Sequence, residues 1–166
     1  MVVAYFAILS GKANAYCIGN DKELPGYDPE YYSVSHEFSR SKYVVRATAL
    51  RAIWLGYDGK EKPLQPPFHS RTAKPMGLDP YVGAYYDVKV LQVFKGNPKP
   101  ELRLFSENST GRFSLNVGSD YILFISEDTF DRPIGVQLTV DNCGNSAAIS
   151  NARTTLHSLQ RLSGGN

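Results

Sequence analysis

Two stretches of the chain alternate apolar and polar residues with the period of a β-strand. From Tyr43 to Leu55 one parity is apolar, and it comprises Val45, Ala47, Ala49 and Ile53. Arg51 interrupts this face, which indicates a bulge. A second strand is expected from Ala84 to Phe94, where the apolar parity switches at Leu91, again as at a bulge.

Three shorter strands and one helix are expected further along the chain. The strands comprise residues 101–106, 120–126 and 136–140. The segment from Tyr121 to Ile125 is apolar on both parities, as in a strand covered on both faces. Helical spacing predicts a terminal helix over residues 146–162, packed through Ile149, Leu156 and Leu159. These elements predict an all-β fold with a C-terminal helix, arranged as a five-stranded Greek-key barrel of the OB type.

The connection between the first two strands, from Gly56 to Gly83, contains five prolines and sustains neither period. Connections longer than about 15 residues without regular structure are uncommon in compact domains and are often functional. Because proline restricts the unbound chain, such a loop presents side chains at a low ordering cost. We expect binding contacts from Phe68, His69 and Arg71; the alternative is an insertion that contacts nothing.

The amino terminus has the pattern of a secretory signal. An apolar run from Val2 to Leu9 is followed by an Ala-Asn-Ala triplet that suits cleavage after Ala15. The run is too short for a membrane-spanning helix, which needs about 20 apolar residues. No Lys or Arg precedes the run, although secretory signals usually have a basic residue there. If the run is not a signal, the alternative is a buried strand. The signal, residues 1–15, predicts a periplasmic or secreted protein whose single domain is residues 16–166.

The two cysteines, Cys17 and Cys143, lie near opposite ends of the mature chain. An oxidising compartment would allow them to form a disulfide. In the chain-entropy model a bridge across so long a loop contributes about 4 to 5 kcal/mol of stability. The alternative is two separate buried thiols. A lipid anchor at Cys17 is rejected, because Tyr16 stands where a lipoprotein signal needs a small residue.

Composition narrows the class of partner. The chain has 166 residues and a formal net charge of only +2, so it is long enough for one domain and lacks the basic field that drives nucleic-acid binding. Eleven tyrosines suit an interface, because tyrosine gives contact area at low entropic cost. The tyrosines alone do not separate a protein partner from a glycan. A protein partner is expected, a glycan is not excluded, and no transmembrane segment is expected.

Candidate catalytic and metal sites are few. His36 and Glu37 begin an H-E-x-x-H pattern, but Arg40 replaces the second histidine, so a surface charge cluster is favoured over a metal site. His69 and His157 are expected to be solvated. No nucleophile or phosphate-loop motif occurs. We therefore expect no catalytic residue, metal or cofactor; the alternative is a secreted hydrolase with an unrecognised active site.

Five segments, taken in order, resemble one group of proteins: Val44-Val45-Arg46-Ala47, Tyr86-Asp87-Val88-Lys89-Val90, Val93-Phe94-Lys95-Gly96, Gly118-Ser119-Asp120-Tyr121-Ile122-Leu123-Phe124 and Asp141-Asn142-Cys143-Gly144. Over residues 17–145 the chain is similar to bacterial secreted proteins of the netrin-like, tissue-inhibitor-of-metalloproteinase-like group. The resemblance implies an OB fold, a cysteine bridge from the Cys-Gly pair to the mature start, and a binding role, with a protease as one kind of partner.

In the animal inhibitors of this group, an N-terminal cysteine offers its amine and carbonyl to the catalytic zinc of a protease. The resemblance therefore makes Tyr16 and Cys17 candidate binding residues. This sequence departs from the pattern, because cleavage after Ala15 makes Tyr16 the first residue and Cys17 the second. Metalloprotease inhibition is one hypothesis within the broader expectation of a secreted binding protein.

Overall fold

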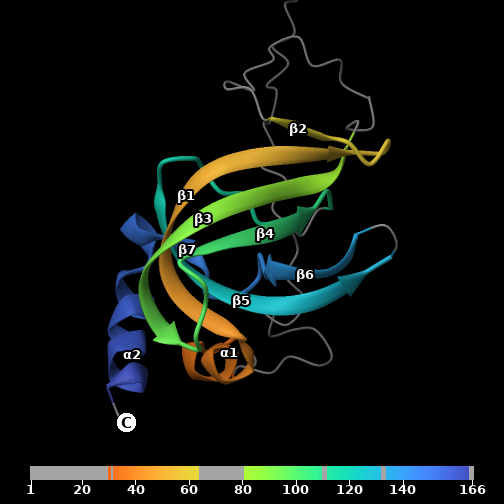
Figure 1. The fold of residues 1–166 in the computed structure, drawn as a ribbon. Helices are drawn as coiled ribbons and strands as arrows, with labels where there is room; N and C mark the ends of the chain where they lie inside the picture. Colours follow the sequence, from red (N-terminus) through yellow and green to blue (C-terminus); the bar gives the residue numbers. More distant parts are fainter. Residues whose placement is uncertain (1–29, 31, 64–80, 110–111, 132–133, 165–166) are drawn as a thin grey trace, which may run out of the picture.

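The computed structural model describes residues 30, 32–63, 81–109, 112–131 and 134–164. Two α-helices, one short 3-10 helix and seven strands occur within these residues (Figure 1). In chain order they are α1 (Val34–Arg40), β1 (Tyr43–Gly56), β2 (Glu61–Pro63), β3 (Tyr81–Lys95), β4 (Glu101–Glu107), β5 (Asp120–Phe130), β6 (Gly135–Val140), β7 (Ala147–Ala148), η1 (Ile149–Asn151) and α2 (Arg153–Ser163).

The strands form a single sheet in the order β2-β1-β3-β4-β6-β5-β7, and an additional pairing joins β1 to β5. That pairing closes β1, β3, β4, β6 and β5 into a ring (Figure 1). Four of the five contacts around the ring are antiparallel. The fifth, between β4 and β6, is parallel and has one Cα pair, Leu104 with Leu138.

The fold is mostly β with a C-terminal helix, as predicted, and the five expected strands are present with slightly different ends. The prediction of five strands was wrong in number, because β2 and β7 extend the sheet to seven. Both are too short, at three and two residues, to give a period-two pattern. The structure also contains α1, a helix of seven residues that we did not predict.

The two expected bulges are confirmed by the register of β1 and β3. Leu91 has no Cα partner, because Val90 is opposite Ala47 and Gln92 is opposite Arg46. Leu50 is likewise skipped beside Arg51. Both side chains are nearly half exposed, at 48% and 42%. The side chain of the residue without a partner turns outward. The residues that follow it then point their apolar side chains to the same face of the sheet as before.

Alternate residues of the strands serve two hydrophobic clusters. The larger cluster lies within the ring and includes Val45, Leu104 and Leu123. The smaller cluster contains Val44 of β1 and Phe124 of β5, which lie on the faces of these strands that point away from the larger cluster. These side chains pack against α1 and α2. Both helices therefore cover one flank of the ring, as Figure 1 shows.

The terminal helix differs from the prediction at its start. Ala147 and Ala148 are extended and pair with β5, and η1 separates them from α2. The predicted helix therefore began too early, because helical spacing of apolar residues continued into a segment whose backbone pairs with the sheet. The packing is as expected, with Leu159 fully buried and Leu156 partly buried against the smaller cluster. Within the described residues, no helix is long and apolar enough to span a membrane.

Candidate functional site

Helix α1 is held in place by a lysine from the β3–β4 hairpin. Lys95 Nζ donates hydrogen bonds to the carbonyl oxygens of Phe38 and Ser39, each at 2.7 Å. A cation near the last carbonyls of a helix satisfies acceptors that have no intrahelical donor. Gly96, with φ of 80°, allows the hairpin to turn directly after this lysine. The aromatic-Lys-Gly segment therefore fixes α1 against the ring.

A second attachment joins α1 to the turn that follows β6. Glu37 Oε2 accepts hydrogen bonds from the backbone N–H of Asn145 at 2.6 Å and from its Nδ2 at 2.7 Å. Asn145 Nδ2 also donates to the carbonyl oxygen of Tyr32 at 2.8 Å. A Cβ at Gly144 would overlap the Glu37 carboxylate, so glycine permits the close approach. The turn and the helix thus form one unit.

Burial raises the pKa of Glu37 above its usual value, and the two hydrogen bonds from Asn145 oppose this shift. In the segment where a surface charge cluster was expected, Glu37 is partly buried and hydrogen-bonded, whereas Arg40 is exposed. The Glu37 carboxylate is a structural acceptor between two elements. Arg40, one turn further along α1, is exposed and is the member of this segment that lines two adjoining pockets.

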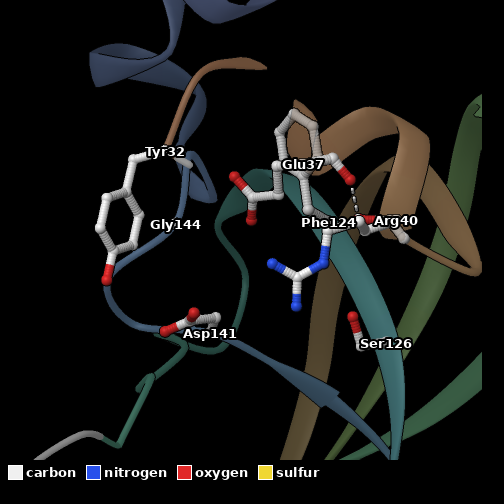
Figure 2. Close-up of a pocket in the computed structure, with 8 residues that line it drawn as sticks. Tyr32, Glu37, Arg40, Phe124, Ser126, Asp141 and Gly144 are labelled. Atoms are coloured by element: carbon white, nitrogen blue, oxygen red, sulfur yellow. Dashed lines mark hydrogen bonds between the residues drawn. The ribbon is translucent and has the colours of Figure 1, made fainter. Parts of the chain in front are cut away.

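A small pocket of about 60 Å³ lies between α1 and the turn after β6. Figure 2 shows the guanidinium group of Arg40 turned into this pocket, between the carboxylates of Glu37 and Asp141, with Ser126 of β5 on the other side. Arg40, Ser126 and Asp141 also line a second, larger pocket of about 320 Å³. The two pockets are therefore adjacent, and Arg40 lies at their junction.

The larger pocket, which we call the seam groove, lies where β4 meets β6. Its walls include residues 105–107 of β4 and residues 139–141 at the end of β6. Asp128 of β5 and Arg112 of the loop after β4 complete its polar lining. Beyond the pair of Leu104 with Leu138, the two strands share no further Cα pair among the described residues. The groove is thus the opening left where two parallel strands separate.

Backbone groups of β4 face this opening. Asn108 N–H donates to Val82 O, and Val90 N–H donates to Pro100 O, both at 2.8 Å. In an antiparallel ladder, hydrogen-bonded pairs alternate with pairs that are not hydrogen-bonded. These two bonds therefore show that the even-numbered residues of β4 direct their backbone N–H and C=O groups to β3. The odd-numbered residues direct their N–H and C=O groups toward β6. Phe105 and Glu107 therefore present backbone groups at the seam.

The same alternation applies to β6. Leu138 is the residue that pairs with β4, so Val140, two residues on, directs its backbone to the same side. No bridge continues the ladder from Phe105 or Glu107 to Val140 within the described chain. The Glu107 C=O is used, since it accepts from Ser109 N–H at 2.9 Å. The N–H of Glu107, which is exposed, and both groups of Val140 are directed toward the seam.

The charged side chains of the groove are the carboxylates of Glu107, Asp128 and Asp141 and the guanidinium groups of Arg40 and Arg112. Arg112 Nη1 donates to Asn108 Oδ1 at 2.5 Å and to the Tyr81 hydroxyl at 3.3 Å, which holds this cation at the rim. The hydroxyl of Thr139 donates to Asp128 Oδ2. Neither Glu107 nor Asp128 forms an ion pair with another residue that the structure describes. Their negative charge is available to a ligand.

The described lining of the groove does not combine a nucleophile with an imidazole or thiol. Its described lining contains no histidine and no cysteine, so the serine hydroxyls have no imidazole base beside them. Within the described part of the chain, no three His, Cys, Asp or Glu side chains are grouped so that they could hold a metal ion. The arrangement can bind through hydrogen bonds and charge.

Five of the site residues predicted from sequence lie outside the described residues: Tyr16, Cys17, Phe68, His69 and Arg71. Cys143 lies in the turn after β6, where its N–H donates to Asp141 Oδ1 at 2.8 Å, beside the seam groove. Its pairing with Cys17 stays a prediction. His157 is exposed on α2.

Sequence reasoning missed the seam groove. Its residues come from α1, β4, β5, β6 and one loop, and no motif spacing connects them. The segment containing Arg40 was noticed, but for a metal-site pattern that it does not complete. No protein-family model and no curated protein matches this chain.

Proposed function

We propose that this protein is an extracytoplasmic binding protein that holds a protein partner at the seam groove, and that it is not an enzyme. The observation that carries the proposal is the groove itself. It brings strand backbone groups, two carboxylates without an ion-pair partner and the exposed cation Arg40 together at one surface. Such a set suits recognition of a polypeptide, which carries both backbone donors and charged side chains.

We further propose that the ring is an OB-type Greek-key barrel. When β2 and β7 are set aside, the ring strands numbered in chain order follow the closed order 1-2-3-5-4-1. The third and fifth strands are parallel, and the first and fourth are antiparallel. This order, with a long first connection, is that of a five-stranded Greek-key barrel. Such barrels commonly bind ligands on an exposed flank.

Export to an oxidising compartment completes the proposal. Cys143 lies beside the seam groove, so a bridge to Cys17 would bring the mature amino terminus and Tyr16 close to the same surface. A netrin-like or inhibitor-like protein would then use its amino terminus together with the groove. A protease is one partner that this arrangement would suit.

Photo-crosslinking in the cells that produce the protein tests this function. A benzophenone amino acid replaces Asp128, which lines the groove, or Thr129, its exposed neighbour on the opposite face of β5. We expect one discrete adduct from position 128 and none of that mass from position 129. Equal labelling from both positions, or none from position 128, would contradict a partner in the groove.

The hydrolase alternative is separated by the same pair of positions. A hydrolase would convert the substrate that it binds, so an adduct from position 128 would be accompanied by substrate turnover. Substitution of Asp128 by Asn would then abolish substrate turnover, while substitution of Thr129 by Ala would not. A binding protein gives the opposite result, an adduct without turnover.

A further inference from the structure

We propose that the seam groove binds an extended peptide segment that carries a lysine or arginine, and that the peptide adds as a strand between β4 and β6. The inference rests on the proposed function, since it specifies how the partner is held. It goes further by naming the partner's conformation and charge. Both follow from the groups that the two separating strands present.

The backbone groups at the seam favour an extended ligand. Strands that separate after a single parallel pair leave edges that an added strand can pair with. At the seam these edges direct the N–H of Glu107 and both backbone groups of Val140 toward the groove. A helix satisfies its own backbone and would leave these groups without partners. An extended segment supplies donors and acceptors at the spacing that they require.

The charges on the groove select the side chains of the peptide. Glu107 stands on the β4 side of the groove and Asp128 on the β5 side, and neither has an ion-pair partner among the described residues. Arg40 lies at the far end beside Asp141 (Figure 2). A basic side chain midway along the groove would meet both carboxylates. An acidic one would be repelled by them.

The volume and walls agree with a peptide ligand. The groove has a volume of about 320 Å³, against about 60 Å³ for the pocket beside α1. Phe105 and Phe130, whose rings lie 5.0 Å apart, form an apolar part of its wall. Because Phe105 and Glu107 are two residues apart on β4, as are Asp128 and Phe130 on β5, the rings and the carboxylates lie on the same face of the sheet. An extended segment directs every second side chain to that face, so basic residues at alternate positions would meet the carboxylates beside these rings.

The probe is the peptide acetyl-Thr-Val-Lys-Val-Lys-Val-Thr-amide, titrated into the full mature protein and followed by amide chemical shifts. We expect the Glu107 and Val140 amide signals to move. The matching peptide with glutamate in place of both lysines should bind at least about tenfold more weakly, because it meets like charges. Equal affinity for the two peptides would overturn the charge argument, and no binding of the lysine peptide at about 1 mM would overturn the proposal.

The chain offers a matched pair of variants for the backbone step. Glu107 and Glu101 are both exposed, and both direct their N–H groups away from β3, but Glu101 does not line the groove. Glu107→Pro removes a seam N–H and should weaken binding of the lysine peptide at least about tenfold. Glu101→Pro should leave the affinity for this peptide unchanged. Equal affinities would overturn strand addition.

Charge and backbone effects are separated by Glu107→Gln, which keeps the N–H. This variant should lose part of the preference for lysine over glutamate, whereas Glu101→Gln should keep all of it. Thermal midpoints of all four variants show whether each folds. Should the cells still give a groove adduct at position 128 while the lysine peptide fails to bind, strand addition is wrong and the binding function stands.

Discussion

At the scale of single residues, Glu37 determines how α1 meets the turn after β6. Its pKa is raised above the usual 4.5 chiefly by burial. The folded protein therefore takes up this proton more readily than the unfolded chain, so the contribution of Glu37 favours folding at low pH and is lost as the pH rises through the folded-state pKa. The carboxylate carries a cost at neutral pH that the Asn145 hydrogen bonds partly offset.

Glu37→Gln tests this directly. The amide oxygen still accepts from Asn145, but no charge is buried. We expect the unfolding free energy of the variant, relative to the wild type, to rise as the pH is increased from about 4 to 7 in urea denaturation experiments. Glu101→Gln, at an exposed position, is the control. A difference that stays constant across this pH range would contradict the assignment.

Gly144 is required by the same contact. Gly144→Ala should lower the unfolding free energy by about 1 to 3 kcal/mol, because the new Cβ overlaps the Glu37 carboxylate. In a Glu37→Ala background the same substitution should cost clearly less. If the two substitutions have additive effects, the overlap with Glu37 is not the cause.

At the scale of elements, the position of Arg40 depends on how α1 is docked. Lys95→Met removes the cation that binds the Phe38 and Ser39 carbonyls and should destabilise the protein by about 1 to 2 kcal/mol. Hydrogen exchange of the α1 amides should accelerate more than exchange in β5. Lys89→Met, at an exposed position on the same strand, is the control. Unchanged exchange in α1 would show that the helix is held by its apolar contacts alone.

Elements with a long and regular pattern could be predicted from the sequence. Val45, Ala47 and Ala49 in β1 define a period-two face, and the bulges beside Arg51 and at Leu91 follow from where that period breaks. Ala147 and Ala148 carry no such signal, and pairing with β5 decides their conformation. Helix α1 is similarly decided by contacts, since its Glu37 bonds to a residue 108 positions away.

The candidate site was less predictable than the fold, for a physical reason. Glu107, Asp128 and Arg40 meet only because β4 and β6 separate after one pair, and nothing in the sequence marks where two strands part. The long first connection, which was expected to carry Phe68, His69 and Arg71, lies largely outside the described residues. Its role stays a prediction.

At the scale of the whole molecule, the predicted disulfide links the mature start to the turn beside the groove. The exported protein should be lighter than its reduced form by two hydrogen atoms, as measured by intact mass. Replacing Cys17 and Cys143 together by serine should cost up to about 4 to 5 kcal/mol in the chain-entropy model. Two free thiols in the exported protein, detected by alkylation, would refute the bridge.

The proposed function depends on the seam groove holding the partner. The most direct test uses the partner that crosslinking identifies. Its dissociation constant is measured, without crosslinking, for the wild type, for Asp128→Lys and for Thr129→Lys. Both positions are exposed and adjacent, but only Asp128 lines the groove. We predict that Asp128→Lys weakens binding by at least about tenfold and that Thr129→Lys leaves it within about twofold. Equal effects at the two positions would contradict the claim.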